Sequence, residues 1–175
     1  VRGVDPRTGA PVAMPIRVTT PEALDAAVVT AAHAFPTWSA LPASARAAAL
    51  RAVADALEDA RADLVALADA ETGLGVTRLT GEVGRTTGQL RMFAARIEDG
   101  GYLEVIVSHA SGDVGRPDLR RMLQPRGPVA VFSASNFPFA FSVAGGDTAS
   151  ALAAGCPVVV KAHEAHPATS AATAV

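Results

Sequence analysis

The sequence predicts an α/β fold in which a helical region leads into a Rossmann-like parallel β-α-β unit. Residues 20–101 carry apolar side chains at helical spacing. Two uninterrupted apolar runs, residues 129–132 (VAVF) and 158–161 (VVVK), have the composition of parallel strands that are buried on both faces. An alanine-rich stretch between them has helical character. Half of the 175 residues are hydrophobic, so a packed core is expected.

Residues 1–19 form the first of four predicted segments, an extended lead-in rich in proline and glycine. Residues 5–9 (DPRTG) have the composition of a turn. The helical segment then begins with Thr20, a good N-cap residue, followed by Pro21 at the first helical position. Because proline disrupts a helix interior, this first helix is expected to end before Pro36.

Two further helices complete the predicted helical segment, residues 20–101. One is expected to start near Pro42, to break around Ala60 and to end at residues 71–73 (ETG). The next is expected from about Leu79 to Ile97, with Gly100 and Gly101 as its stop.

Residues 102–125 are expected to form a strand-rich connection, with strands at 102–108 and 119–123 around a loop at 111–117. The last segment, residues 126–175, is the β-α-β unit, truncated at its C-terminal end. Its connecting helix is expected to run to Ala154, with Gly155 as its cap. Gly145 and Gly146 are expected to break this helix, with Asp147 capping its second half.

Composition excludes several classes of protein. The 15 basic and 17 acidic residues form no run of like charge, so neither nucleic acid nor an anionic membrane surface is an expected partner. The uncharged stretch from 128 to 146 contains Asn136, Pro138 and several serines, so we interpret it as strand, turn and helix rather than a membrane span. A single cysteine, Cys156, excludes an internal disulfide and favours a cytoplasmic location.

Ligands of open parallel sheets bind beyond the carboxyl ends of the strands. Polar residues follow both predicted strands, at 133–138 and 161–167. These segments fit a binding site, but they also fit ordinary surface loops, and the periodicity alone does not separate the two.

Several motifs in register decide between these alternatives. They are GPVAVF (127–132), SNFP (135–138), ALAAG (151–155) and VVVK (158–161), with upstream matches at 34–35 (AF), Trp38, Arg46, 71–73 (ETG) and 82–83 (EV). Over essentially its whole length the chain resembles the aldehyde dehydrogenase superfamily. Residues 134–138 (ASNFP) and 144–150 (AGGDTAS) are most similar to its branch of ketoglutarate-semialdehyde and fatty-aldehyde dehydrogenases.

The resemblance implies a reaction and a set of site residues. A cysteine thiolate attacks an aldehyde, hydride passes to NAD(P), and water activated by a glutamate hydrolyses the thioester. Asn136 matches the oxyanion-hole asparagine, although an asparagine here also suits a turn. The residues that match cofactor-binding positions are Ser133, Ala134, Ser135, Lys161, His163 and Glu164. For Lys161 and Glu164 the alternative is a solvated charge at a strand end.

The family nucleophile lies in a Gly-Gln-X-Cys segment that this sequence does not contain, so Cys156 is interpreted as a structural thiol. We therefore expect a fragment, inactive alone, of an NAD(P)-dependent aldehyde dehydrogenase, with 2-oxoglutarate semialdehyde as the candidate substrate. Glu164 favours NAD over NADP. The resemblance implies a homo-oligomer, a dimer or tetramer, for the full-length protein. The alternative is a self-contained, non-catalytic nucleotide-binding or interaction protein.

No metal site is expected. His163 and His166 are one residue too close for the His-Glu-X-X-His spacing of zinc proteases. The Gly73-Leu74-Gly75 sequence begins like a dinucleotide fingerprint, but it follows a helix and lacks the third glycine, so it is interpreted as a helix stop.

Overall fold

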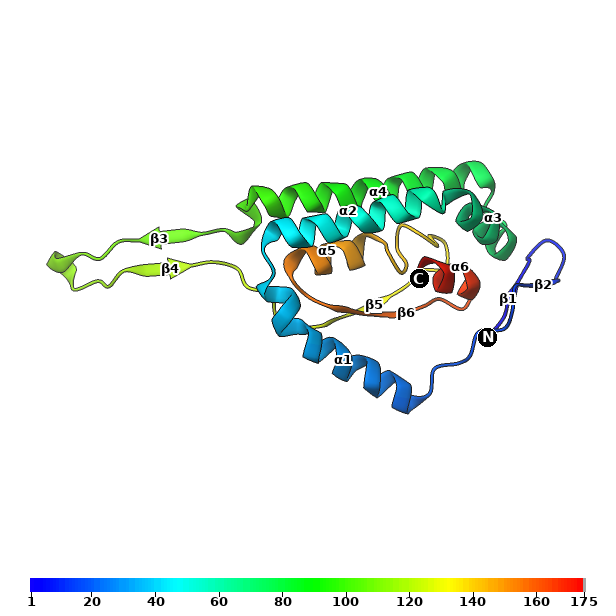
Figure 1. Ribbon diagram of the computed structural model, residues 1–175, viewed down its shortest axis with the longest axis horizontal. Coiled ribbons are helices and arrows are strands. Elements are labelled where there is room, and N and C mark those ends of the chain that lie inside the picture. Colours follow the sequence, from blue (N-terminus) through cyan, green and yellow to red (C-terminus); the bar gives the residue numbers. More distant parts are fainter. Residues whose placement is uncertain (175) are drawn as a thin grey trace.

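The computed structural model describes residues 1–174, so the predicted end of the β-α-β unit at Val175 lies outside the described residues. A layer of long helices packs above a β-α-β unit, and two hairpins extend from this body (Figure 1). In chain order the elements are β1 (Gly3–Val4), β2 (Pro11–Val12), α1 (Pro21–Ala40), α2 (Ala43–Asp59), α3 (Arg61–Thr72), α4 (Val76–Asp99), η1 (Gly101–Leu103), β3 (Ile106–Ser108), η2 (Gly112–Val114), β4 (Leu119–Arg121), β5 (Val129–Phe132), α5 (Gly146–Ala154), β6 (Val158–Lys161) and α6 (Pro167–Thr173).

The main core lies between α2, α3, α4 and α5. Leu50 of α2 and Leu79 and Leu90 of α4 are almost completely buried in it. The predicted break at Ala60 separates α2 from α3. Gly73 ends α3 in the left-handed conformation with φ 66°, where glycine is favoured, so the predicted helix stop is confirmed.

The β-α-β unit is present as predicted. Strands β5 and β6 are parallel, with Val129 opposite Val158 and Phe132 opposite Lys161. The expectation that both faces of these strands are buried is wrong for this chain, because Val129 is 36% and Phe132 is 72% exposed. A two-stranded sheet with one crossover helix has too little covering structure to bury both faces.

The first helix is longer than predicted. Thr20 caps it by accepting a 3.2 Å hydrogen bond from the Ala23 amide, as expected. The predicted end before Pro36 is wrong, because α1 continues to Ala40 with Pro36 inside it. Proline removes only one helical amide, and the turn beyond it is held by the indole N–H of Trp38, which donates to the Leu152 carbonyl at 3.0 Å.

Three other local expectations are wrong. Tyr102 lies in the 3-10 turn η1 rather than in a strand, and its hydroxyl lies 3.0 Å from the Arg46 guanidinium, which donates to it. Residues 139–145 form turns rather than helix. Asp147 lies inside the first turn of α5, and Gly145 is the N-cap. A Cβ at Gly145 would lie 2.4 Å from the Ala140 carbonyl oxygen, so only glycine permits this close approach.

Two short hairpins extend from the body. β1 pairs with β2 across the predicted turn at residues 5–9, where the Asp5 carbonyl accepts from the Gly9 amide at 2.8 Å. β3 and β4 form an antiparallel arm that projects away from the helices (Figure 1). The division into four segments is a prediction that this order of elements does not test. Among residues 1–174, no helix is both long and apolar enough to cross a membrane.

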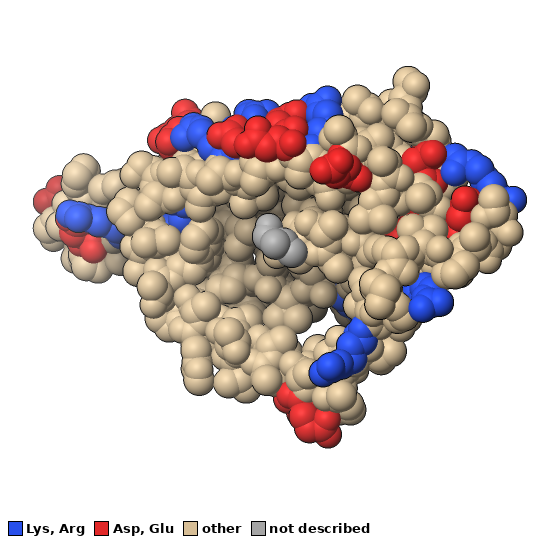
Figure 2. All heavy atoms as spheres, turned by 45° about the vertical axis from the view of Figure 1, so that its right-hand side comes forward, with Lys and Arg blue, Asp and Glu red and all other residues tan. Residues whose placement is uncertain are grey.

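Charged side chains gather along the upper edge of the molecule, over the helical layer, whereas the face below is largely uncharged (Figure 2). Ion pairs tie α2 to α4 along this edge, including Arg51 with Glu98 and Arg91 with Asp55. This edge is therefore a solvated helical surface of mixed charge.

Candidate functional site

The two predicted polar loops lie side by side at the carboxyl ends of β5 and β6. Their proximity follows from the parallel register, which places Phe132 opposite Lys161. The Ser133 amide donates to the Lys161 carbonyl at 3.1 Å and continues the ladder by one step. All the predicted cofactor-binding positions therefore belong to one edge of the sheet.

The first loop, residues 133–138, turns its polar side chains in two directions. Ser133 is buried, and its hydroxyl lies 3.3 Å from the Ser142 hydroxyl. The Ala134 amide donates to the Phe141 carbonyl at 2.8 Å, which closes the loop. Ser135 and Asn136 are exposed at its tip. The exposed polar side chains that this loop offers to a ligand are thus the Ser135 hydroxyl and the Asn136 amide.

Helix α4 holds this loop from one side. Glu82 is buried, and its Oε1 accepts hydrogen bonds from the amides of Phe139 at 2.8 Å and Ala140 at 2.9 Å. One turn earlier, the Arg78 guanidinium donates to the Asn136 carbonyl at 2.6 Å. The main chain on both sides of the Asn136 side chain is thereby fixed, while the side-chain amide itself stays exposed.

His166 joins the two loops. It is fully buried, with Nε2 2.9 Å from the Ala134 carbonyl oxygen and Nδ1 3.2 Å from the Ser170 hydroxyl. A carbonyl only accepts, so Nε2 carries a proton, while Nδ1 and the Ser170 hydroxyl share the second hydrogen bond. His166 is therefore a structural link between the loop after β5 and helix α6.

The second loop carries an exposed ion pair. The Lys161 ammonium donates to Glu164 Oε2 at 3.0 Å, and this hydrogen bond lowers the pKa of the Glu164 carboxyl. Glu164 is consequently ionised at neutral pH. The His163 ring lies beside the pair and accepts from the Ala165 amide at Nδ1, 3.1 Å away. Lys161 and Glu164 thus offer a donor and an acceptor at adjacent points of the rim.

Buried polar side chains of the helical layer fix the remaining parts of the unit. The Glu71 carboxylate accepts from the amides of Ala168 at 2.9 Å and Thr169 at 2.7 Å, at the first turn of α6. Arg46 is buried and donates through Nε to the Ala153 carbonyl at 3.3 Å, near the end of α5. A buried charge is stable when it is fully hydrogen-bonded, and backbone groups together with the Thr169 and Tyr102 hydroxyls supply those bonds here.

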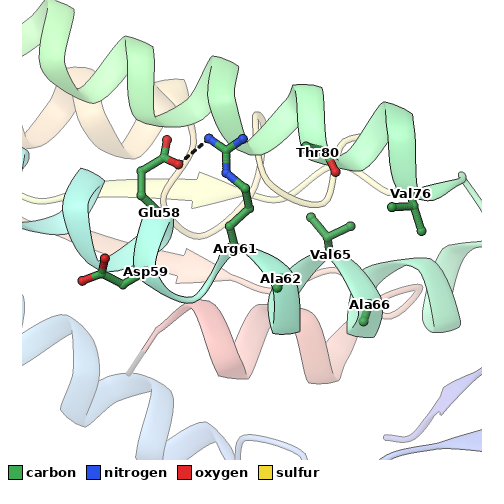
Figure 3. Close-up of a pocket in the computed structure, with 8 residues that line it drawn as sticks. All are labelled: Glu58, Asp59, Arg61, Ala62, Val65, Ala66, Val76 and Thr80. Atoms are coloured by element: carbon green, nitrogen blue, oxygen red, sulfur yellow. Dashed lines mark hydrogen bonds and ion pairs between the residues drawn. The ribbon is translucent and has the colours of Figure 1, made fainter.

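Two other features lie apart from these loops. Cys156 is free and buried, which agrees with its prediction as a structural thiol. A hollow of about 540 Å³ lies between α2, α3 and α4, and a Glu58–Arg61 ion pair crosses one end of it (Figure 3). Val76 and Thr80 line it from the face of α4 opposite to Arg78. It contains no residue of the predicted site.

Comparison with known proteins identifies the fold. The sequence model described as the aldehyde dehydrogenase family matches residues 1–175. The chain belongs to the aldehyde dehydrogenase family. The chain is 51% identical over 174 residues to alpha-ketoglutaric semialdehyde dehydrogenase 2 of Azospirillum brasilense. This match covers 97% of the chain and 33% of the relative. The alpha-ketoglutaric semialdehyde dehydrogenase of Acinetobacter baylyi is 45% identical over 150 residues, or 84% of this chain and 28% of the relative.

Solved structures agree with this membership. The chain superposes on an NADP-dependent enzyme of E. coli with a TM-score of 0.86 and 27% identity, over 99% of this chain and 34% of that one. This aldehyde dehydrogenase chain spans about a third of the length of the relatives it matches. Enzymes of the family use NAD(P).

Sequence reasoning found the two loops but not the residues that hold them. Glu71 and Glu82 were quoted only as parts of matching motifs, and Arg78 and His166 were given no role in the site. One signal was available for Glu82, a carboxylate within an otherwise apolar helical face. A charge at such a position requires a hydrogen-bond partner from elsewhere in the chain.

Proposed function

We propose that this chain forms part of an NAD(P)-dependent aldehyde dehydrogenase that oxidises an aldehyde to a carboxylic acid. The observation that carries the proposal is the exposed Asn136 side chain, on a loop with a fixed backbone, next to the edge of a parallel β-α-β unit. This arrangement supports a role for Asn136 as an oxyanion donor. In a chain of this family, a thiolate nucleophile and a general base would come from residues other than those present here.

The proposed cofactor site fits the donor set of the two loops. NAD(P) accepts the hydride when it is bound. The Glu164 carboxylate is suited to accept from ribose hydroxyls, and the Lys161 ammonium is suited to donate to a ribose or phosphate oxygen. Ser135 offers a hydroxyl from the neighbouring loop, and His163 lies beside the ion pair. Ser133 and Ala134, whose polar groups are bonded within the protein, are proposed to shape the loop that the cofactor contacts.

The test of Asn136 uses the full-length protein that contains this chain. Asn136→Ala should lower kcat for aldehyde oxidation by about 100- to 1000-fold, the usual effect of removing one oxyanion donor, with little change in cofactor affinity. Asn136→Asp has the same size but no N–H donor, so it should lose as much activity as the alanine variant. A normal rate in either variant, with the chemical step limiting, would refute the role.

The isolated chain of 175 residues gives a complementary test. It should produce no NAD(P)H from aldehydes, because its one cysteine is buried and is interpreted as a structural thiol. Activity above a no-enzyme control that disappears in Cys156→Ser would instead make Cys156 the nucleophile. Binding of NAD(P) without turnover by a full-length protein would favour the non-catalytic alternative.

We further propose that the enzyme prefers NAD to NADP. A 2′-phosphate near Glu164 would bring two negative charges together, although Lys161, which pairs with Glu164, offsets part of that repulsion. Glu164→Thr should shift the ratio of kcat/KM values towards NADP by about 1–3 kcal/mol in transition-state terms. An unchanged ratio would show that Glu164 does not face the ribose.

The state of association and the location are also proposals. We propose a homo-oligomer, a dimer or tetramer, in the cytoplasm. The arm formed by β3 and β4 supports association, because Ile106, Val107 and Leu119 are each about half exposed on it and a two-stranded hairpin is barely stable alone. Light scattering of the full-length protein should give a dimer or tetramer, and a monomer would refute the proposal.

A further inference from the structure

Two arginines of α4 lie against the aromatic rings that follow Asn136. The Arg85 guanidinium carbon is 5.0 Å from the Phe141 ring centre and 6.0 Å from that of Phe137. Arg78 lies 5.3 Å from the Phe137 ring centre. The two rings contact each other edge to face, with centres 5.2 Å apart. Both cations therefore lie at the rim of the loop that carries the proposed oxyanion donor.

The charge of Arg85 is not neutralised by a neighbouring carboxylate. Within residues 1–174, Arg85 makes neither an ion pair nor a hydrogen bond, whereas Arg91 and Arg96 on the same helix are each paired with an aspartate. Glu82 is the nearest carboxylate along α4, but it is buried, with Oε1 turned to the amides of Phe139 and Ala140. Arg85 thus presents an exposed, unpaired positive charge.

An aromatic ring beneath a guanidinium leaves its N–H edges free. Contact with the ring face stabilises the cation and reduces its hydration, while the donors in the guanidinium plane remain able to bind an anion. A carboxylate matches those donors with two parallel hydrogen bonds. Arg78 differs, because one of its nitrogens already donates to the Asn136 carbonyl. Of the two arginines, Arg85 is the one with all of its donors available.

Distance along the loop sets the size of a ligand that would reach both groups. Phe137 directly follows Asn136, so their Cα atoms are about 3.8 Å apart, and Arg85 lies against that same phenylalanine. Asn136 and Arg85 are therefore separated by about one phenylalanine side chain of the same loop, which is the span that a ligand contacting both would have to cover.

We propose that Arg85 determines substrate specificity by binding a carboxylate at the end of the aldehyde remote from the reacting carbonyl. The substrate class is then a short ω-oxo carboxylic acid, a semialdehyde, rather than a neutral aliphatic aldehyde. This inference rests on the proposed function, since it takes Asn136 as the point where the reacting oxygen lies.

The test compares two substrates of equal chain length in the full-length enzyme, 2-oxoglutarate semialdehyde and the neutral aldehyde pentanal. Arg85→Gln should raise KM for the semialdehyde by about 10- to 100-fold, the loss expected for hydrogen bonds to a charged group, with a smaller change in kcat. The same variant should leave kcat/KM for pentanal within about twofold of wild type. Arg85→Lys should restore part of the loss, because it keeps the charge but not the paired donors.

Arg96→Gln is the matched control, because it removes one positive charge from α4 at an exposed residue that pairs with Asp99. It should leave both substrates unaffected. If Arg85→Gln impairs both substrates equally, or neither, the proposal is overturned while aldehyde oxidation by wild type still stands. If wild type oxidises neither substrate under conditions where cofactor binds, the proposed function itself fails.

Discussion

The helical layer and the β-α-β unit are stabilised in different ways. In the layer, side chains such as Leu50, Leu79 and Leu90 are at most 1% exposed and pack against one another. In the unit, Phe132 is 72% exposed, and β5 and β6 form a sheet of only two strands. The apolar core lies between the layer and helix α5 of the unit, whereas the two-stranded sheet contributes little to it.

Polar side chains of the helices compensate for this difference by binding the backbone of the unit. Arg46 of the layer and Trp38 of α1, on the other side of the unit, bind carbonyls near the end of α5. Glu71 binds amides of α6, and Glu82 binds amides of the loop after β5. Hydrogen bonds are directional where apolar contacts are not, so they fix the site loops in a defined position on the layer.

Leu90→Ala should have the largest effect on stability. Leu90 is 1% exposed in the apolar core, so its truncation should lower the free energy of unfolding by about 2–5 kcal/mol. Urea unfolding followed by circular dichroism would measure the change. Met92→Ala on the same helix is the control, because Met92 is 52% exposed and should change stability little. Equal losses in the two variants would contradict a core centred on Leu90.

Glu71→Ala should have a smaller and more local effect. It removes the acceptor for Ala168 and Thr169, which should lower stability by about 1.5–3 kcal/mol, the contribution of hydrogen bonds to a charged group. Hydrogen exchange should show faster exchange of amides 168–170 while α2 and α4 stay protected. Glu71→Gln keeps one acceptor oxygen and should lose less. Uniformly faster amide exchange throughout the helical layer would show that the loss of Glu71 destabilises the layer as a whole and not α6 alone.

These two kinds of interaction also separate what the sequence could predict from what it could not. The cap at Thr20, the break at Ala60, the stop at Gly73 and the two parallel strands were predicted correctly, because these signals act through local geometry. The end of α1 at Pro36 was predicted wrongly, because Trp38 makes its deciding contact 114 residues away in sequence. Local propensity contains no information about such a partner.

In the candidate site, too, local features could be predicted from the sequence and long-range contacts could not. The motif around Asn136 marked the loop itself, but the orientation of the loop depends on Glu82, 57 residues before Phe139. Residues 139–145, between the loop at 133–138 and α5, were predicted as the first part of the connecting helix. The amides of Phe139 and Ala140 instead donate to Glu82, and Gly145 packs directly on the Ala140 carbonyl. Long-range hydrogen bonds override propensity at this point of the chain.

The attachment of the N-terminal hairpin to α3 should give the smallest effect and a defined pH dependence. The Arg7 guanidinium donates to Asp69 Oδ1 at 2.8 Å, and the Gly75 amide donates to the same oxygen at 2.8 Å. The hydrogen bond from Arg7 is the main cause that lowers the pKa of Asp69 in the folded protein, and the bond from Gly75 adds to it. A carboxyl with a lowered folded pKa stabilises the protein fully above its unfolded pKa, near 3.9, and this stability is lost as the pH falls through the folded pKa. Asp69→Asn should therefore be less stable than wild type at neutral pH, and the two unfolding free energies should converge below about pH 4.

The difference should be smaller than for Glu71→Ala, because Arg7 and Asp69 are both partly exposed to solvent, which screens the pair. Urea unfolding at a series of pH values from 3 to 7 would measure it, with Asp63→Asn on α3 as the control, since Asp63 is exposed. A constant gap between Asp69→Asn and wild type across that range would show that the carboxylate charge is not what holds the hairpin to α3.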